Sequence, residues 1–514
     1  MADRRYYLTT PIYYVNDAPH IGHAYTTLAC DVLARFMRLD GREVLFLTGT
    51  DEHGQKVEKS AAAAGMPPKA FTDKVSQNFR DLARDMKFSN DDFIRTTEPR
   101  HIRACQALWQ RLIERDQIYL GKYAGWYAVR DEAYYAEDEL TTGPSGKKIA
   151  PSGAEVEWVE EPSYFFRLSA WQDRLLAFYD ANPDFVAPES RRNEVRSFVR
   201  GGLKDLSVSR TSFKWGVPVP NDPAHIMYVW LDALTNYITA AGFPDIESET
   251  YRKFWPADLH MVGKDILRFH AVYWPAFLMA ADLAPPHRVF AHGWWTNEGQ
   301  KISKSVGNII DPLQLIERYG LDAVRYFLLR EIPFGGDGDF SHRAMVNRMN
   351  GDLANDFGNL AQRVLSMINK NCGAVVPTPG PFTAADEAML AAARAVYPKL
   401  AAEIGRQAFH VGLETIWQVI GAANRYVDEQ APWALRKTDP IRMGTVLYVV
   451  AEVVRRLAIL AQPFMPDSCG RLLDQLAVPA DQRQFAALDG MLTAGVSLPK
   501  PEGVFPRFVD PAAS

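Results

Sequence analysis

The sequence predicts an α/β fold built on a Rossmann-like, doubly wound parallel sheet, followed by an all-α C-terminal domain. Apolar strands alternate with amphipathic helical patterns over residues 1–116 and again over 216–340. Beyond about residue 340 the pattern is helical to residue 478, with one break at 373–381. We therefore expect a catalytic α/β part that is interrupted once and then followed by a helical domain.

Local patterns predict the elements of the first part. Residues 22–39 have helical periodicity and follow Asp17 and Pro19, which favour a helix start. Helical patterns also fill 54–116, with a break at Pro67. Short apolar runs bounded by turn residues predict buried parallel strands at 6–10, 43–47, 259–263 and 288–292. Ligands of such a sheet are expected at the carboxyl ends of its strands.

Residues 117–215 predict an inserted α+β connective domain. Aromatic residues alternate from about 118 to 168, and a Gly-, Pro- and Lys-containing stretch at 141–153 predicts an exposed loop. The predicted core of this domain is aromatic: Trp126, Tyr127, Tyr134, Tyr135, Trp158, Tyr164, Phe165 and Phe166. The chain then divides into 1–116 and 216–340 (two halves of a catalytic domain), 117–215 (the insertion) and 341–514 (the helical domain with its tail).

Composition excludes several classes of protein. A net charge of −5 argues against a protein that coats nucleic acid with a general positive field. The four cysteines are widely spaced, which indicates neither a disulfide framework nor a thiolate zinc site. No uninterrupted apolar stretch approaches 18 residues, and the first residues have no apolar signal region. We therefore expect a cytoplasmic protein without membrane contact or a thiolate-bound zinc.

Two short peptides predict a site for a nucleoside triphosphate. His20-Ile21-Gly22-His23 places two imidazoles at the start of a helix, where backbone N–H groups favour anions, and Gly22 leaves room for a flat group. Lys301-Ile302-Ser303-Lys304-Ser305 follows a turn at 297–300 and brings two cations together on a loop. Taken singly, the first peptide could be a helix cap and the second a solvated turn. No Walker-type phosphate loop occurs in the sequence.

With these two peptides in this order, the chain resembles the class I aminoacyl-tRNA synthetases. It is most similar to their methionyl family, through segments that include Thr48-Gly49-Thr50-Asp51-Glu52-His53-Gly54 and Tyr228-Val229-Trp230-Leu231-Asp232-Ala233. The resemblance implies ATP-dependent activation of L-methionine to methionyl-adenylate and transfer of methionine to tRNA(Met) with its CAU anticodon. It further implies ATP with Mg²⁺ and a monomeric enzyme.

The resemblance also assigns residues to these steps. His20, His23, Lys301 and Lys304 would be catalytic, and ATP would contact these four together with Gly22, Gly263, Asp265 and Ser303. Methionine would be held by Ile12, Tyr14, Asp51, Trp230, Tyr237, Phe269 and His270, with Asp51 facing its ammonium group. The anticodon would be read by Asn359, Arg363 and Trp433 in the helical domain.

Some alternatives stay open on the sequence alone. Asp51 could instead cap the following helix, and Trp433 could be a helix-packing residue. Many members of the family carry a cysteine-ligated zinc in the inserted domain, but this chain has Ala128 and Asp131 at the corresponding positions, so no zinc is expected. Other functions to weigh are a cysteine- or leucine-type class I synthetase, a small-substrate nucleotidyltransferase and a non-catalytic tRNA-binding paralogue.

Overall fold

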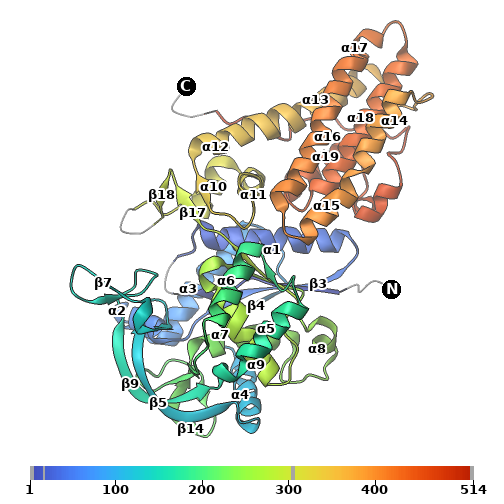
Figure 1. Cartoon of the computed structure of the whole chain (residues 1–514). Helices are drawn as coiled ribbons and strands as arrows, with labels where there is room; N and C mark the ends of the chain where they lie inside the picture. Colours follow the sequence, from blue (N-terminus) through green and yellow to red (C-terminus); the bar gives the residue numbers. More distant parts are fainter. Residues whose placement is uncertain (1–4, 16–17, 303–306, 510–514) are drawn as a thin grey trace. The chain divides into compact units, whose positions relative to one another are not determined.

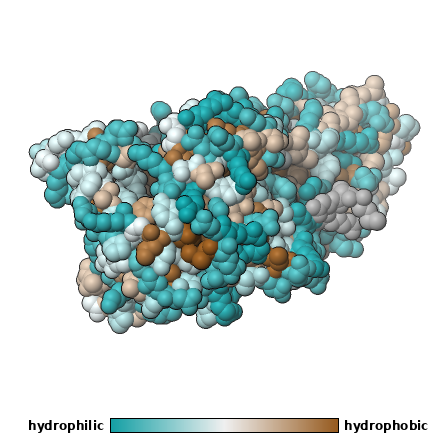
Figure 2. Space-filling view, turned by 60° about the horizontal axis from the view of Figure 1, so that its bottom comes forward, coloured by the Kyte–Doolittle hydropathy of each residue, from teal (hydrophilic) through white to brown (hydrophobic). Residues whose placement is uncertain are grey.

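The computed structural model describes residues 5–15, 18–302 and 307–509. Internal contacts divide the chain into two compact units. We call Arg5–Pro19 with Val44–His292 the sheet unit, and Met1–Arg4 and His20–Glu43 with Gly293–Ser514 the helical unit. None of the described helices has the length and apolar character needed to cross a membrane. Hydrophilic residues cover most of the face shown in Figure 2, where hydrophobic residues form small groups.

A seven-stranded sheet is the centre of the sheet unit. Its strands are β1 (Arg5–Thr9), β2 (Tyr13–Tyr14), β3 (Glu43–Asp51), β4 (Asp92–Arg95), β10 (Val186–Ala187), β15 (Leu259–Gly263) and β16 (Val289–His292). The order is β10-β16-β15-β1-β3-β2, and β4 also pairs with β3. The described pairings with printed register, such as Leu8 opposite Leu259, are parallel. The strands β2, β3 and β4 lie on one side of β1, and the later strands β15, β16 and β10 lie on its other side. The chain therefore winds in both directions from the centre, which confirms the doubly wound sheet.

The predicted helical stretch at 54–116 is interrupted by a strand. Three helices lie there, α2 (Gln55–Ala63), α3 (Pro68–Asp85) and α4 (Pro99–Glu114), but β4 separates α3 from α4. Only Phe93 and Ile94 are apolar in this strand, so its pattern was too short to be separated from its helical neighbours. The strand predicted at 43–47 is also longer, because β3 continues to Asp51.

The sheet unit also contains later helices, which follow the first strands of the insertion. They are α5 (Gln172–Ala181), α6 (Glu189–Arg200), α7 (Val229–Ala241), α8 (Glu249–Phe254) and α9 (Trp274–Ala280). Every residue of α7 except Ala240 is buried, so this helix forms part of the core on all sides. It packs along α4 in the same hydrophobic cluster. The position of Trp230 and Tyr237 is therefore fixed by a helix that is surrounded by protein.

Two long antiparallel strands form the inserted region. β5 (Ile118–Ala128) and β9 (Glu157–Phe166) pair over their whole length and curve together in Figure 1. β6 (Ala133–Tyr135) and β11 (Leu206–Ser207) extend this sheet, and β7 (Thr141–Thr142) and β8 (Lys148–Ile149) form a separate hairpin. Three further strands, β12 (Ser209–Arg210), β13 (Pro218–Val219) and β14 (Asp222–Met227), form a small sheet of their own.

The predicted aromatic core of the insertion is partly wrong. Tyr127 and Phe166 are buried, but Trp158 is 52% exposed. Trp158 lies opposite Trp126 in the β5–β9 ladder, and the two rings meet edge to face at 5.3 Å. Alternation along a strand sends successive side chains to opposite faces, so not all aromatic residues of β9 can reach one core.

The helical unit begins with α1 (Ile21–Leu39), which agrees with the predicted helix at 22–39. A three-stranded sheet follows from β17 (Trp295–Asn297), β18 (Gln300–Lys301) and β19 (Gly338–Phe340). The next helices are α10 (Pro312–Tyr319), α11 (Leu321–Arg330), α12 (His342–Asn347), the π-helical η5 (Arg348–Gly358) and α13 (Asn359–Asn371). Within this unit Arg325 of α11 pairs with Asp31 of α1 at 2.7 Å, and both side chains are fully buried.

The remaining helices form a bundle around α18. They are α14 (Ala384–Arg394), α15 (Val396–Gly405), α16 (Phe409–Gln430), α17 (Pro432–Leu435), α18 (Pro440–Ala461) and α19 (Pro466–Gln475). α18 is buried without interruption from Met443 to Ala461 and contacts α13, α14, α16 and α19. The chain between α13 and α14 is non-helical, in agreement with the predicted break at 373–381. The tail returns over this unit, where Phe505 stacks on Phe357 at 5.5 Å.

Candidate active site

A narrow pocket lies in the sheet unit at the carboxyl ends of β1 and β3. It lies where the winding of the sheet reverses, which is the expected ligand position in an open α/β sheet. The residues that line it are Pro11, Ile12, Tyr14, Asp51, Trp230, Ala233, Leu234, Tyr237 and His270. Six of the seven residues predicted to hold methionine are therefore brought together.

Phe269 is the predicted residue that does not line this pocket. Its ring stacks on Trp230 with centroids 3.8 Å apart and planes 7° from parallel, so it supports the wall that Trp230 forms. Sequence reasoning missed Pro11, Ala233 and Leu234. The last two follow Trp230 by three and four residues on α7, and this helical spacing was the signal that could have found them.

A hydrogen-bonded chain fixes the rings at one side of the pocket. The Nδ1 of His270 lies 2.9 Å from the carbonyl oxygen of Ile266, so this nitrogen carries the proton. The Nε2 then accepts from the hydroxyl of Tyr237 at 2.7 Å. Burial lowers the pKa of His270 to about 4, which keeps the imidazole neutral at physiological pH. The result is an uncharged, polarizable wall that suits an apolar or thioether side chain.

Asp51 gives this pocket its charge. The side chain is 2% exposed, and its Oδ1 has no hydrogen-bond partner among the described residues. Burial, together with the carboxylates of Asp232 and Glu132, raises the pKa of Asp51 well above its usual value. The alternative that Asp51 caps α2 is not supported, because the N-cap residue is Gly54 and receives no side-chain hydrogen bond. A buried carboxylate of this kind is a site for a cationic donor such as an ammonium group.

Two other buried carboxylates near Asp51, those of Glu52 and Asp232, are already paired with basic side chains. Glu52 accepts from Arg95 at 2.6 and 2.9 Å. Asp232 lies between His53 and His101, each with a nitrogen 2.7 Å from one carboxylate oxygen. The ligand-type atoms of His101, Cys105 and Asp232 lie within 4.8 Å of one another. Both oxygens of Asp232 are already held by imidazoles, so this cluster is satisfied without an ion.

The histidine motif forms the first turn of α1 in the helical unit. His20 is the N-cap residue, and its Nδ1 accepts from the backbone N–H of Gly22 at 3.1 Å. The Nδ1 of His23 accepts in turn from the backbone N–H of His20 at 3.1 Å, which completes a capping box. The helix-cap alternative is thus a correct description of the local structure. It does not exclude the anion site, because each ring has a second nitrogen.

The capping bonds decide which nitrogen of each ring carries the proton. An Nδ1 that accepts a hydrogen bond is unprotonated, so the proton of a neutral imidazole lies on Nε2. Burial, and the ring of His20 at 3.9 Å, lower the pKa of His23 well below its usual value. His23 is therefore a neutral ring whose Nε2–H is a hydrogen-bond donor.

The lysine motif begins at the end of a hairpin in the same unit. Glu298 and Gly299 form the tight turn between β17 and β18, both with positive φ, as predicted for 297–300. Lys301 ends β18 and is exposed. Ser303 and Lys304 lie outside the described residues. The chain after the motif is tied to the histidine motif by a hydrogen bond from Ile21 N–H to Ile310 O at 3.1 Å.

Gly263 and Asp265, the remaining predicted nucleotide contacts, follow the end of β15. An added Cβ at Gly263 would lie 2.5 Å from Oδ1 of Asp265, so the close approach of that carboxylate requires glycine. Asp265 is exposed in a 3₁₀ turn that runs to Ile266. Both residues lie at the carboxyl end of β15, and ligands of open α/β sheets bind at the carboxyl ends of the strands.

The three predicted anticodon residues lie on one face of the helical unit. Asn359 and Arg363 are one helical turn apart on α13, and Trp433 follows Pro432 at the start of α17. Trp433 is 50% exposed, which contradicts the alternative of a helix-packing residue. The guanidinium carbon of Arg363 lies 5.6 Å from the centre of the Trp433 ring, and Arg363 also pairs with Asp428 of α16 at 2.8 Å. The arrangement offers a flat ring and polar donors to an unpaired base.

The inserted region has no cysteine cluster at the positions compared with zinc ligands. Ala128 packs into a small apolar cluster with Ala150, Ala154 and Val156. Asp131 accepts hydrogen bonds from the hydroxyls of Tyr135, at 3.0 Å, and Ser152. An apolar cluster and a hydroxyl-bonded carboxylate do not provide the thiolate donors that a structural zinc requires.

Comparisons with known proteins cover nearly the whole chain. Residues 6–365 match the family described as class I tRNA synthetases (M), and residues 376–513 match the anticodon-binding domain of methionyl tRNA ligase. The methionine--tRNA ligase of Mesorhizobium japonicum is 59% identical, and 99% of each chain is covered. The Mycobacterium tuberculosis methionyl-tRNA synthetase in complex with methionyl-adenylate is 56% identical with a TM-score of 0.97, covering 98% of this chain and 100% of that one. The free state of the same mycobacterial enzyme gives a TM-score of 0.91 at 52% identity, with 99% of each chain covered.

Proposed function

The chain belongs to the class I methionine--tRNA ligases, which use ATP to activate methionine and load it onto tRNA, and we propose that it does so with the residues described above. The observation that carries this assignment is the unpaired Oδ1 of Asp51 in an otherwise aromatic, uncharged pocket. An amino acid with an ammonium group and an unbranched thioether side chain satisfies both features.

In the proposed methionine complex, the ammonium group pairs with Asp51 and the side chain lies against Trp230, Tyr237 and His270. The raised pKa of Asp51 supports this role, because a bound cation compensates the cost of ionising a buried carboxyl. Because apolar pockets discriminate poorly against one missing or added methylene, about 10- to 200-fold, close analogues of methionine are expected to react slowly.

The first reaction joins the methionine carboxylate to the α-phosphorus of ATP and releases pyrophosphate. The substrate supplies its own nucleophile, so the protein contributes position and charge stabilisation. His20 and His23 donate from Nε2 to phosphate oxygens, while Lys301 and Lys304 neutralise the leaving pyrophosphate. Gly263 and Asp265 hold the adenosine part, with Gly22 and Ser303 as further ATP contacts. Mg²⁺ bound to ATP supplies additional charge neutralisation.

In the second reaction, the methionyl group passes to a ribose hydroxyl at the end of tRNA(Met). We assign recognition of the CAU anticodon to Asn359, Arg363 and Trp433. The exposed Trp433 ring and the adjacent guanidinium support this assignment, since stacked bases need a flat surface.

Four further properties belong to the same proposal. The chain works without zinc, because Ala128 and Asp131 replace thiolates. It acts as a monomer and in the cytoplasm. Its functional domains are 1–116 and 216–340 for catalysis, 117–215 for the insertion and 341–514 for the anticodon.

Pyrophosphate exchange with single amino acids tests the proposal. Labelled pyrophosphate should enter ATP with methionine and Mg²⁺ in the absence of tRNA, and far less with leucine or cysteine. Equal exchange with leucine or cysteine would assign the chain to another synthetase specificity. If none of the amino acids supported exchange, the chain would instead be a tRNA-binding paralogue or a nucleotidyltransferase with another substrate.

A further inference from the structure

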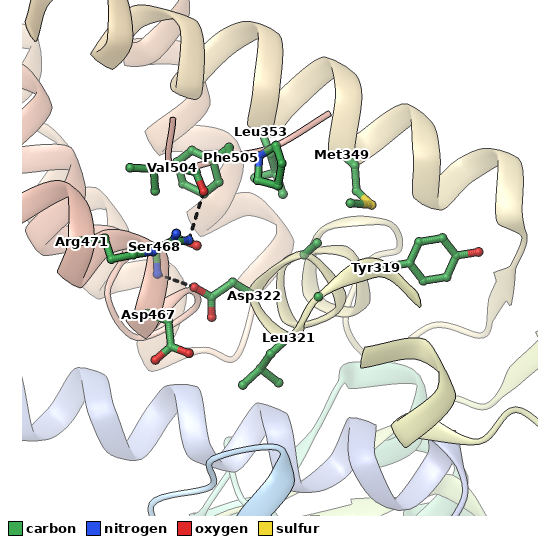
Figure 3. A pocket seen from close by; sticks show the side chains of 13 residues that line it. Tyr319, Leu321, Asp322, Met349, Leu353, Asp467, Ser468, Arg471, Val504 and Phe505 are labelled. Atoms are coloured by element: carbon green, nitrogen blue, oxygen red, sulfur yellow. Dashed lines mark hydrogen bonds between the residues drawn. The ribbon is translucent and has the colours of Figure 1, made fainter. Parts of the chain in front are cut away.

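The cavity shown in Figure 3 and the proposed methionine pocket differ in what lies behind their walls. α11, η5, α19 and the tail segment 504–506 of the helical unit enclose the cavity, and the hydrogen bond from the backbone N–H of Ser468 to Asp322 joins α19 to α11. The methionine pocket has an aromatic wall with a second buried ring behind it. This ring belongs to His260, which does not line the pocket itself.

Two hydrogen bonds fix the ring of His260. The residue lies on β15, directly opposite Thr9 of β1, and is fully buried. The indole N–H of Trp274 donates to its Nε2 at 3.2 Å, so the proton of the neutral imidazole lies on Nδ1. This Nδ1 donates to Oγ1 of Thr9 at 2.8 Å. Burial, with a smaller contribution from His270, lowers the pKa of His260 well below its usual value, so the ring is uncharged at physiological pH.

The ring of His260 covers one face of Tyr237. The two ring centroids are 4.1 Å apart, and the planes are 28° from parallel. Tyr237 lines the pocket, and its hydroxyl donates to Nε2 of His270 at 2.7 Å. α7 sets the backbone of Tyr237, but in a close-packed interior the adjacent atoms decide how far a side chain can tilt. His260 therefore limits the movement of the Tyr237 ring away from the pocket.

We propose that His260 is a positioning residue that sets the depth of the methionine pocket through the ring of Tyr237. This inference rests on the function proposed above and adds a residue that determines its specificity. His260 does not line the pocket, so it acts through Tyr237. When the imidazole is removed, Tyr237 can move into part of the space that it leaves, and the pocket then accepts a longer side chain.

Pyrophosphate exchange by the full-length protein with methionine and with ethionine, which carries one more methylene on its sulfur, measures this depth. One methylene in an apolar pocket changes kcat/KM by about 10- to 200-fold. His260→Asn removes the ring and keeps an amide that can donate to Thr9, and His260→Gln removes it and keeps an oxygen that can accept from Trp274. In each variant that folds, the preference for methionine over ethionine should fall about fivefold or more, with a higher methionine KM and an unchanged KM for ATP. An unchanged preference in either folded variant would overturn the proposal.

His260→Phe separates the effect of the ring from that of its hydrogen bonds. The variant keeps a flat ring against Tyr237 but leaves the N–H of Trp274 and the hydroxyl of Thr9 without their imidazole partner, so it should unfold at a lower temperature. Its preference for methionine should stay within about twofold of wild type, because the stacked ring is retained. A preference as low as that of His260→Asn would show that the ring is not what positions Tyr237.

His225→Asn is the matched control. His225 is a buried histidine of β14, with its Nδ1 2.9 Å from the hydroxyl oxygen of Ser209 and its ring edge to face with that of Tyr164 at 5.0 Å. The change should lower the unfolding temperature and leave the methionine preference unchanged, because none of these residues lines the pocket. A reduced preference here would show that lost stability alone changes the ratio, which would also overturn the proposal. Failure of the wild-type protein to exchange with methionine is a different result and would overturn the proposed function.

Discussion

Replacing Asp51 by Asn should separate its role in binding from any role in stability. The free protein holds this carboxyl buried, with Oδ1 unpaired and with Asp232 and Glu132 nearby. Because its folded pKa is raised, Asp51 destabilises the fold at every pH above its unfolded pKa, and this cost grows with pH until the pH passes the folded pKa. Asn removes this cost, so the variant should be more stable by about 1–3 kcal/mol.

The same change should impair methionine binding. Removing one partner of a buried, charged hydrogen-bonded pair costs about 2–5 kcal/mol, which corresponds to a rise in the methionine KM of roughly 30- to 5,000-fold. Pyrophosphate exchange over a range of methionine concentrations measures the KM. Thermal unfolding at pH 7, with and without methionine, measures stability, and the stabilisation by methionine should disappear in the variant.

The adjacent residue Glu52 provides a matched control. Its carboxylate is fully buried but paired with Arg95, so Glu52→Gln breaks a satisfied ion pair and should destabilise the protein by about 3–5 kcal/mol. Neighbouring acid-to-amide changes are thus expected to shift the unfolding temperature in opposite directions. If Asp51→Asn unfolded at a lower temperature, as Glu52→Gln should, Asp51 would be a structural residue and the ammonium assignment would be refuted.

Four other outcomes are expected. His23→Ala should lower the kcat of adenylate formation by about 100-fold or more with little change in methionine affinity, because the Nε2–H of His23 acts on charge that develops in the transition state. An unchanged rate of adenylate formation in pre-steady-state assays would reject this role. Trp433→Ala should lower tRNA charging by roughly ten- to a hundredfold and leave tRNA-independent pyrophosphate exchange and thermal stability near wild type. Burial raises the pKa of Glu132 to about 7, so Glu132→Gln should stabilise the protein at pH 8 and have little effect near pH 4.5, as followed by denaturant unfolding. Elemental analysis should find no stoichiometric zinc, and chelation of zinc should leave exchange intact when Mg²⁺ is resupplied.

Periodicity and spacing predicted the parts of the fold that have long, regular patterns. The helix α1, the parallel strands β1, β3, β15 and β16, and the helical C-terminal region were found in this way, whereas the two-residue strands β2 and β10 were not. The strand β4 was missed because two apolar residues carry no measurable period. Trp158 was placed in a core because composition alone does not indicate which face of β9 is covered.

The candidate site shows the same division between local and tertiary information. The motif residues His20 and His23 were identified, and their caps follow from the local sequence. The position of Phe269 behind Trp230 depends on the packing of two segments about 40 residues apart in sequence. The charge environment of Asp51 likewise depends on Glu132, which comes from the inserted region. The sequence around Asp51 does not predict that Glu132 lies near it.

The protonation state of His20 and His23, in the first turn of α1, affects how the proposed phosphate site releases pyrophosphate. Two histidines next to phosphates would ordinarily be expected to gain positive charge and retain any polyanion. Here both Nδ1 atoms are occupied by backbone N–H groups, and the pKa of His23 is depressed. Neutral donors hold anions more weakly than cations do. The two histidines can therefore stabilise the charge that develops in the transition state without binding the released pyrophosphate tightly. In the proposed site, retention of the leaving group then falls to the cationic side chains of the lysine motif.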